Sequence, residues 1–310
     1  MRYLTIPGID KPVSRIAMGT ASLPQADYER APGILDAFIE LGGNCIDTAH
    51  IYGRGANERM LGRWLAERGR RADVVLIDKC CHPIDESGPR VAPEFIHADL
   101  AESLERLGTD YVDMYLLHRD DERVPVGPLI EALNEERAAG RIRAFGGSNW
   151  RVERIAAANA YAAEHGLTGF ALSSPNLSLA RPKEPMWAGC HSATDADRAW
   201  HAQTRLPLLS WSSQAGGFLS GRFKPEDTSN ADMLRVWYSE QNFERLRRAV
   251  ELGQRKRVGP IPIALAYVLS QPFPSIAIVG PASVAELEES IQALEVALTP
   301  DELAYLDLKG

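Results

Sequence analysis

An aspartate, a tyrosine, a lysine and a histidine stand at positions from which one catalytic site could collect them. Asp47 and Tyr52 lie in the segment 43–53, just after a short apolar run, while Lys79 ends the run Val-Leu-Ile-Asp-Lys and His118 ends the run Tyr-Leu-Leu-His. If each run is a β-strand, the four side chains come at strand ends, where α/β folds keep their catalytic groups. The sequence therefore predicts a catalytic loop at 43–53 and a shared site around it.

These residue types could deliver a proton to a developing alkoxide. A tyrosine phenol has a free pKa of about 10 and is a poor acid at neutral pH unless a cation stabilises its phenolate. Lys79 could supply that charge, and Asp47 could keep a buried lysine protonated. His118 could donate to the substrate oxygen or pass protons, so the set describes a general acid with an electrostatic relay behind it.

Each of the four residues also has a purely structural interpretation. Asp47 could cap the next helix, Tyr52 could be a core residue, Lys79 could be solvated, and His118 could be a satisfied histidine at a strand end. The joint placement of all four favours the catalytic interpretation.

Strands and helices alternate along the chain, which is the pattern that would bring the four residues to one rim. Residues 3–6, a Pro-Gly turn and residues 13–18 predict an N-terminal hairpin leading into the first core strand, which ends at Gly19 and Thr20. Compact apolar runs predict the other strands, and amphipathic stripes predict the helices between them. The further strands are expected to end at 46, or to span 74–78, 111–117, 142–146, 169–172, 206–211 and 275–279, with helices at 31–41, 57–67, 93–107, 128–139, 151–164, 240–255, 261–269 and 284–294.

Eight apolar strands separated by amphipathic helices predict a parallel sheet that is covered on its outside. Eight such units in 310 residues fit a closed (β/α)₈ TIM barrel, an α/β fold, here with an N-terminal β-hairpin. The segments 178–204 and 216–238 are too long for simple connections and are expected to be loops that cover substrate or cofactor at the C-terminal rim. No Ser/Gly linker or charge block divides the chain, so residues 1–310 are expected to form a single domain.

Composition narrows the class of protein. With 45% hydrophobic and 25% charged residues the chain suits a soluble globular enzyme, and its net charge of −8 argues against a nucleic-acid surface. Neither a leader at 1–16 nor an apolar run of membrane-spanning length is found, so a cytoplasmic location without a membrane partner is expected. The cysteines, 4 in number, are too few and too irregular for a disulfide framework or a zinc knuckle, so reduced thiols are expected.

Five motifs, in order along nearly the whole chain, resemble the aldo-keto reductase family. They are Asp-Thr-Ala-His-Ile-Tyr-Gly at 47–53, Lys79, Tyr-Leu-Leu-His ending at His118, Gly-Gly-Ser-Asn-Trp at 146–150, and Leu-Leu-Ser-Trp-Ser at 208–212. The resemblance implies a barrel that reduces an aldehyde or ketone, or oxidises the alcohol in reverse, with a nicotinamide cofactor bound across the C-terminal rim and no metal. By position it implies that Tyr52 is the general acid, that Lys79 and Asp47 tune it, and that His118 orients the carbonyl.

The resemblance also implies the cofactor contacts. Ser148 and Asn149 match the pair that holds the nicotinamide carboxamide, Trp211 matches the aromatic under the nicotinamide ring, and Ser173 or Ser174 stands near the position of a usual glutamine. An aromatic face fixes which side of the ring meets the substrate, and small residues let the backbone approach phosphate. The other implied cofactor positions are Gly19, Thr20, Asp47, Ser212, Ser213, Gln214, Gly216, Arg222, Gly280, Ser283, Glu286, Glu289 and Ser290.

The choice between NADP(H) and NAD(H) depends on the segment that follows the last strand. NADP-preferring relatives usually place a basic or hydroxyl residue against the 2′-phosphate, whereas this chain offers Ala282 and Glu286, and a carboxylate repels phosphate. Ser290 stands where the family usually has an asparagine. NADP(H), the family default, is expected, with NAD(H) as the competing cofactor.

The substrate is expected to be a small carbonyl compound or a sugar, held by loop side chains. Aromatic walls suit the apolar face of such a molecule, and His82, just past Lys79, is expected to tune its polarity beside Tyr52 and His118. The candidate walls are Leu23, Tyr28, His82, Trp150, Trp187, Trp237 and Tyr238.

Two functions of other classes remain open. Some proteins that look like aldo-keto reductases act chiefly as cofactor-sensing subunits with marginal turnover, and the intact set with Tyr52 favours an enzyme over such a sensor. An aldolase would use Lys79 as a Schiff base and needs an uncharged amine, which a neighbouring Asp47 would oppose.

Overall fold

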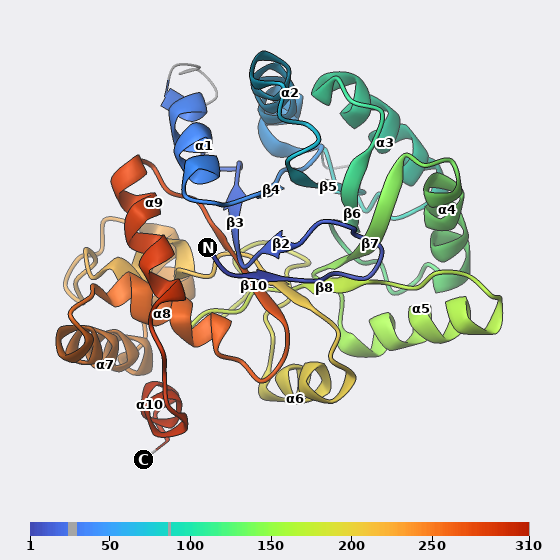
Figure 1. The fold of residues 1–310 in the computed structure, drawn as a ribbon. Coiled ribbons are helices and arrows are strands. Elements are labelled where there is room, and N and C mark those ends of the chain that lie inside the picture. Colours follow the sequence, from blue (N-terminus) through green and yellow to red (C-terminus); the bar gives the residue numbers. More distant parts are fainter. Residues whose placement is uncertain (24–29, 86–87, 310) are drawn as a thin grey trace.

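The computed structural model describes residues 1–23, 30–85 and 88–309. Eight parallel strands of these residues close into a barrel in the order β10-β3-β4-β5-β6-β7-β8-β9, which confirms the predicted (β/α)₈ fold. Figure 1 shows the helices ranged around the strands. The barrel strands are β3 (Ile16–Gly19), β4 (Cys45–Asp47), β5 (Val75–Cys80), β6 (Val112–Leu117), β7 (Ile142–Ser148), β8 (Leu172–Ser174), β9 (Leu208–Ser210) and β10 (Ser275–Val279).

The helices lie outside the barrel and bury their apolar stripes against its outer face. Leu100 of α3 and Leu133 of α4, for example, share one buried cluster with Leu76 and Tyr115, which point outward from neighbouring strands. The helices are α1 (Arg30–Glu40), α2 (Ala56–Arg68), α3 (Pro93–Leu107), α4 (Val126–Ala138), α5 (Val152–Glu164), α6 (Asp195–Thr204), α7 (Glu240–Lys256), α8 (Pro260–Leu269), α9 (Val284–Ile291) and α10 (Pro300–Leu306).

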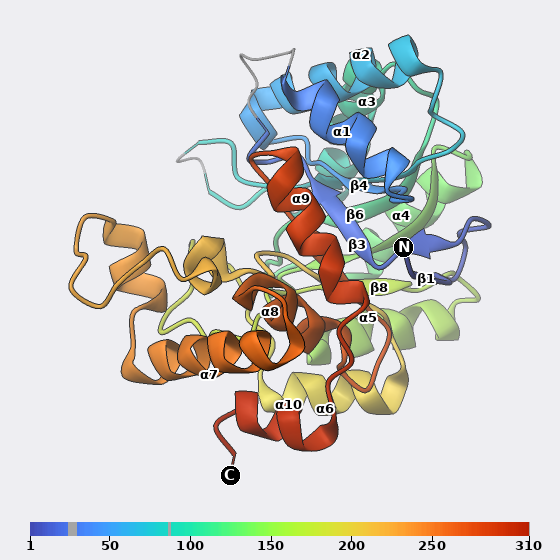
Figure 2. The same cartoon turned by 60° about the vertical axis from the view of Figure 1, so that its left-hand side comes forward.

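The predicted N-terminal hairpin is present and closes one end of the barrel. Its strands β1 (Tyr3–Leu4) and β2 (Val13–Ser14) pair antiparallel. Ile6, Ile9 and Val13 join the apolar cluster that fills the barrel interior. Figure 2 shows the hairpin on one side of the molecule and the segment between β9 and α7 reaching out on the opposite side, so the rim with the long loops stays open.

Alternation along the strands decides which side chains reach that open rim. The interior cluster takes alternate residues, such as Val75 and Ile77 of β5 and Met114 and Leu116 of β6. Successive side chains of a strand point to opposite faces, so every second residue points into the barrel. At the C-terminal end of each strand, the residue that continues this inward series faces the open rim. Those residues are Gly19, Asp47, Lys79, His118, Ser148, Ser174, Trp211 and Gly280.

Some elements differ from the sequence predictions. The segment 178–204 is not loop throughout, because α6 forms its end, and α10 is a further helix that periodicity did not indicate. Both helices begin with a capping box, at Thr194 with Asp197 and at Thr299 with Glu302. That box was the available signal, since the short and polar α6 carries little apolar periodicity.

The other long loop also contains short helical turns. A 3₁₀ segment (Ala215–Ser220) and a π-helical turn (Met233–Trp237) interrupt the segment expected to be loop at 216–238. Lys79 lies inside β5 rather than just past its end, because β5 extends beyond the predicted end at residue 78, to Cys80. Among the described residues, no helix combines the length and apolar character needed to cross a bilayer.

Candidate active site

A cavity of about 470 Å³ opens at the C-terminal rim of the barrel. The ends of β3, β4, β5, β6, β7 and the residues after β9 and β10 line it, so strands far apart in the sequence contribute to one wall. Asp47, Tyr52, Lys79 and His118 all line this cavity. Strand parity places three of them there, and Tyr52 comes from the turn after β4.

Lys79 is the centre of a buried polar group. Its Nζ lies 2.6 Å from Asp47 Oδ1, donates to Tyr52 Oη at 3.2 Å and donates to the Thr48 carbonyl at 2.9 Å. The lysine is 2% exposed and the aspartate 3%, so solvent screens the pair little. Tyr52 enters the group because the chain turns at once after β4 into a 3₁₀ segment (Tyr52–Gly55).

The electrostatics of this group follow from burial and pairing. Burial opposes the charge on Lys79, but Asp47 and Tyr52 together hold its pKa above the ordinary value. Burial raises the pKa of Tyr52, and the nearby ammonium only partly offsets that rise. The phenol therefore holds its proton at neutral pH, because Lys79 lowers the pKa of Tyr52 by less than burial raises it.

His118 faces the same cavity as an uncharged ring. Burial, reinforced by the positive charges of Lys79 and Arg119, puts its pKa well below the ordinary value. The His118 ring meets the Tyr52 ring edge-on with centroids 5.7 Å apart, and Nδ1 has no hydrogen-bond partner within the described parts of the chain. A neutral imidazole can donate one hydrogen bond, so His118 can hold a substrate oxygen near Tyr52.

Asn149 joins three strand ends beside this group. Its Nδ2 donates to the His118 carbonyl at 3.1 Å, and its Oδ1 accepts from the Trp211 indole and from the His191 amide, each at 3.1 Å. Ser148 donates to the Ser174 carbonyl at 3.0 Å. These bonds fix the orientation of the Trp211 ring at the cavity wall.

The loop after β9 brings backbone close to the cavity. Ser212, Ala215, Gly216 and Gly217 all have positive φ values, between 49° and 89°. A Cβ on Gly217 would lie 2.4 Å from Arg222 Nη2, so the glycine makes room for a guanidinium that also lines the cavity. The left-handed turns and small side chains leave space for an extended anionic ligand.

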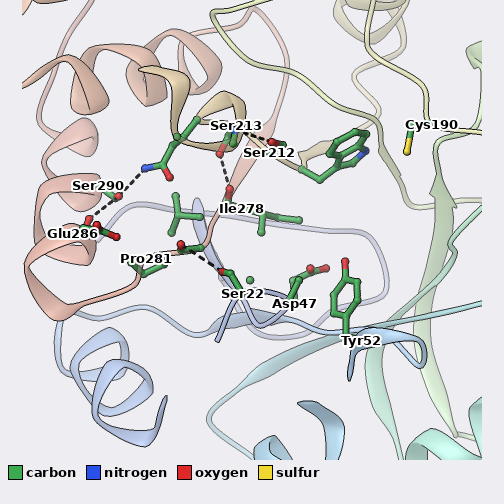
Figure 3. A pocket seen from close by; sticks show the side chains of 18 of the residues that line it. Ser22, Asp47, Tyr52, Cys190, Ser212, Ser213, Ile278, Pro281, Glu286 and Ser290 are labelled. Carbon is green, nitrogen blue, oxygen red and sulfur yellow. Dashed lines mark hydrogen bonds between the residues drawn. The ribbon is translucent and has the colours of Figure 1, made fainter. Parts of the chain in front are cut away.

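The far end of the cavity is formed by the start of α9. Glu286 Oε2 accepts from the Ala282 amide at 2.7 Å, and Ser290 accepts a hydrogen bond from Gln214 at 3.0 Å. Ser283 caps α9 by accepting from the Glu286 amide and does not line the cavity. Figure 3 shows Tyr52, Asp47 and Cys190 on one side of the pocket and Glu286 and Ser290 on the other, so the cavity has two chemically different ends.

The residues at the two ends and between them fit a nicotinamide nucleotide. An aromatic face, a glycine-rich turn with an arginine, and the Glu286, Glu289 and Ser290 side chains of α9 follow one another along the cavity wall. The buried Ser174 Oγ has no partner within the described residues, although Ser174 itself does not line the cavity. Most expected cofactor positions come together here: Gly19, Asp47, Ser148, Asn149, Trp211, Ser212, Ser213, Gln214, Gly216, Arg222, Gly280, Glu286, Glu289 and Ser290 line the cavity, whereas Thr20, Ser174 and Ser283 do not.

Two of the aromatic residues expected as substrate walls belong to the core instead. Trp150 and Trp237 are each 1% exposed and do not line the cavity. The Trp150 indole donates to the Arg119 carbonyl at 3.0 Å and its ring packs edge-on against Phe170. Both tryptophans belong to the main buried apolar cluster, so they contribute to packing.

The remaining candidate walls divide between the cavity and its surroundings. Trp187 lines the cavity, is 58% exposed and lies with its ring 6.1 Å from that of Trp211. His82 does not line the cavity, but its ring contacts that of His118 at 4.8 Å. Leu23 is buried and Tyr238 half-buried, both away from the cavity lining, and Tyr28 lies outside the described residues.

Several cavity residues were not identified from the sequence. Ile278 is one of the inward-pointing residues of β10, so the alternation of side chains along that strand could have identified it. Arg119 directly follows His118, and Ser22 follows the end of β3. Cys190 comes from the segment between β8 and α6, and no local pattern indicated it. Among the described residues, no group of three His, Cys, Asp or Glu side chains is placed to hold a metal ion.

Comparisons with known proteins agree with this geometry. A family model described as the aldo/keto reductase family matches residues 15–309. The uncharacterized oxidoreductase YrpG of Bacillus subtilis is 29% identical over 99% of this chain and 95% of its own length. Norsolorinic acid reductase stcV of Emericella nidulans is 30% identical over 93% of this chain and 74% of its own. Aldo-keto reductase yakc [NADP(+)] of Schizosaccharomyces pombe is 28% identical over 87% and 79%.

Proposed function

Because the chain belongs to the aldo/keto reductase family, we propose that it reduces an aldehyde or ketone to the alcohol, or oxidises that alcohol in reverse, with Tyr52 as the general acid. The observation that carries the proposal is the contact of Tyr52 with Lys79, itself paired with Asp47, at the wall of a cavity that also holds His118. The proposal keeps the sequence prediction of one domain over residues 1–310 and a cytoplasmic location.

The proposed reduction moves one hydride and one proton to the carbonyl. The reduced nicotinamide nucleotide, when bound, supplies the hydride to the carbonyl carbon. The carbonyl oxygen takes the proton from Tyr52 Oη, and the tyrosine regains a proton from solvent. His118 donates a hydrogen bond to the same oxygen, which orients it toward Tyr52.

Lys79 and Asp47 act on Tyr52 and not on the substrate in this proposal. The ammonium, 3.2 Å from Tyr52 Oη, stabilises the phenolate that remains after proton transfer. Asp47 keeps that ammonium charged at a buried position. The same pairing argues against an aldolase, because Schiff-base formation needs a neutral amine.

The cofactor in the proposal is NADP(H) or NAD(H), held along the cavity from Trp211 to the start of α9. NADP(H) is supported by the family default and by the name of the Schizosaccharomyces pombe relative, which includes NADP(+). NAD(H) is supported by Glu286 and Glu289, two carboxylates at the far end of the cavity, where a 2′-phosphate would be repelled.

The test combines turnover with nucleotide binding. We expect the protein to oxidise NADPH or NADH in the presence of an aldehyde panel. Tyr52→Phe should lower kcat by about 10²- to 10⁴-fold, because the general acid is removed. Tryptophan-fluorescence titrations with each nucleotide should show that Tyr52→Phe still binds, and they also determine which nucleotide the protein prefers.

A matched tyrosine variant separates this role from a general loss of structure. Tyr161 lies on the outer helix α5 and its hydroxyl contacts Glu131, so Tyr161→Phe should keep full activity. Tight nucleotide binding without turnover for any carbonyl would contradict the reductase and would favour the alternative, a cofactor-sensing subunit.

A further inference from the structure

The positively charged side chains at the cavity wall differ in what they already bind. Lys79, Arg119 and Arg222 are the described lysines and arginines that line it. Lys79 is paired with Asp47, and Arg222 lies in the glycine-rich loop expected to meet the nucleotide phosphates. Arg119 is at the other end, next to His118, and the proposed reduction assigns it no task.

The position of Arg119 is well defined by its neighbours. Its Nη1 donates to the His118 carbonyl at 2.9 Å, and its own carbonyl accepts from the Trp150 indole at 3.0 Å. Gly189 leaves room for it, because a Cβ there would lie 3.3 Å from Arg119 Cδ. The guanidinium is therefore held between the end of β6 and the segment that carries Trp187 and Cys190.

Arg119 acts on the groups at the substrate end of the cavity. Burial raises the pKa of the Cys190 thiol and the pKa of Tyr52, and the positive charge of Arg119 opposes both rises. Arg119 also adds to the burial that lowers the pKa of His118. Its charge is thus felt where the carbonyl oxygen would lie.

No carboxylate neutralises Arg119 within the part of the chain that the structure describes. A guanidinium offers five N–H donors, and the bond to the His118 carbonyl uses one of them. The three acidic residues that follow in the chain are committed elsewhere: Asp120 pairs with Arg154, Asp121 with Arg123 and Glu122 with Arg151.

The charges of the cavity are unequally distributed. Asp47 is the described carboxylate at the Tyr52 end, and Lys79 balances it, so Arg119 leaves that end positive. The carboxylates of Glu286 and Glu289 lie at the opposite end (Figure 3 labels Glu286). A planar guanidinium with unused donors beside a reaction centre suits bidentate binding of a carboxylate or phosphate.

We propose that Arg119 selects carbonyl compounds that carry a carboxylate or phosphate group, and binds that group while the carbonyl oxygen meets Tyr52 and His118. The inference rests on the proposed reductase activity and names its substrate class. It makes Arg119 a specificity-determining residue that touches the substrate away from the reacting atoms.

The test compares acids with their neutral analogues. The panel pairs 3- and 4-carboxybenzaldehyde with their methyl esters, and glyceraldehyde 3-phosphate with glyceraldehyde, so that carboxylate and phosphate are judged separately. The native protein should show a higher kcat/KM for the charged member of at least one pair. Arg119→Met should lower that value by about 10- to 100-fold and change the neutral analogue by less than about threefold, because a hydrogen-bonded charge is lost. Arg119→Lys should retain part of the preference.

A nearby arginine provides the control. Arg123 is exposed and paired with Asp121 on the same loop, so Arg123→Met should leave the ratio of charged to neutral substrates unchanged. An equal preference for both members of every pair in the native protein would overturn the inference while the reductase stands. An equal loss for both members in Arg119→Met would also overturn it, since the residue would then support structure or nucleotide binding.

Binding without turnover decides the matter even if no carbonyl is reduced. Benzoate and benzamide differ in charge and not in shape, and both can be titrated against tryptophan fluorescence with and without oxidised nucleotide. We expect benzoate to bind the native protein more tightly than benzamide and to lose that advantage in Arg119→Met. Equal binding of the two by the native protein would refute an anion site at Arg119, whereas absent turnover alone would refute the proposed function.

Discussion

Tyr52 shows how burial and charge compete at one residue. The hydroxyl is in contact with Lys79, the half-buried ring meets that of His118 edge-on, and loss of solvent outweighs the ammonium in setting the pKa of Tyr52 above its ordinary value. A phenol that holds its proton at neutral pH is in the correct state to donate to an alkoxide, which is a far stronger base. The lysine contributes after the transfer, when the phenolate needs a countercharge.

The pH dependence follows from these directions. Because the pKa of Tyr52 is raised above its ordinary value, its protonated form persists through neutral and mildly alkaline pH, so the kcat of reduction should be flat there and fall only at higher pH. Alcohol oxidation needs the phenolate and should rise with pH over the same range. The pKa of His118 is far below its ordinary value, so no inflection is expected between about pH 7 and 9. Rate profiles in both directions check this, with circular dichroism at each pH as the control for unfolding.

A fall in the reduction rate centred near neutral pH would contradict this account. It would mean that the buried phenol or imidazole titrates in the neutral range, and that the ammonium of Lys79 has the dominant influence on Tyr52.

At the scale of elements, the glycine-rich turn after β9 is the part of the site with the strictest requirements on backbone conformation and side-chain size. Gly217 has a φ of 89°. Its lack of a side chain makes room for Arg222, because a Cβ on Gly217 would lie only 2.4 Å from Arg222 Nη2. A residue with a side chain at position 217 would therefore have two effects. It would strain the backbone at positive φ, and it would displace the Arg222 guanidinium.

Two glycines at positive φ separate those effects. Gly217→Ala and Gly166→Ala both put an alanine at positive φ and should each cost about 1 kcal/mol of unfolding free energy. Gly217→Ala displaces Arg222, whereas Gly166 follows α5, does not line the cavity, and a Cβ there meets no described atom within 4 Å outside its chain neighbours. We expect Gly217→Ala to weaken nucleotide affinity by roughly tenfold, and Gly166→Ala to leave it nearly unchanged. Chemical denaturation and fluorescence titration measure the two quantities, and equal affinity losses would refute the role of Arg222.

At the scale of the whole molecule, the barrel is closed but not uniformly paired. The register joins β6 to β7 through five residue pairs and β5 to β6 through four, whereas β8 meets β9 through the single pair Ser173 and Leu208. These strands are buried throughout except at Arg143 of β7, so exposure does not distinguish them. The seam between β8 and β9 is therefore the most sparsely paired part of the ladder, with one further parallel bridge beyond the strand ends, between Asn176 and Trp211.

Hydrogen exchange should find that seam. Amides in peptides covering 172–174 and 208–210 are expected to exchange at least about tenfold faster than those covering 112–117 and 142–148, because fewer ladder pairs must open together. Mass spectrometry of the native protein measures both regions in one experiment. Equal protection, or faster exchange in β6 and β7, would show that the helices and not the ladder determine local opening.

Much of the fold could be read from local patterns in the sequence. Apolar runs and helical stripes identified the barrel, and the four proposed catalytic residues were found because each follows or ends such a run. Helix α6 was not predicted because it is short and mostly polar, and its signal is the capping box at Thr194. Lys79 was expected past its strand, yet the parity with Val75 and Ile77 already directed it inward.

What the sequence determined alone is therefore the alternation of side chains along each strand and the kind of chemistry at the strand ends, since both depend on neighbours in the chain. The tertiary structure decided which loop residues reach the cavity: Trp150 and Trp237 lie in the core, whereas Arg119 and Cys190 line the cavity. It also decided the direction of the pKa of Tyr52, because burial arises from contacts between segments distant in sequence, and no local pattern encodes how much water those contacts exclude.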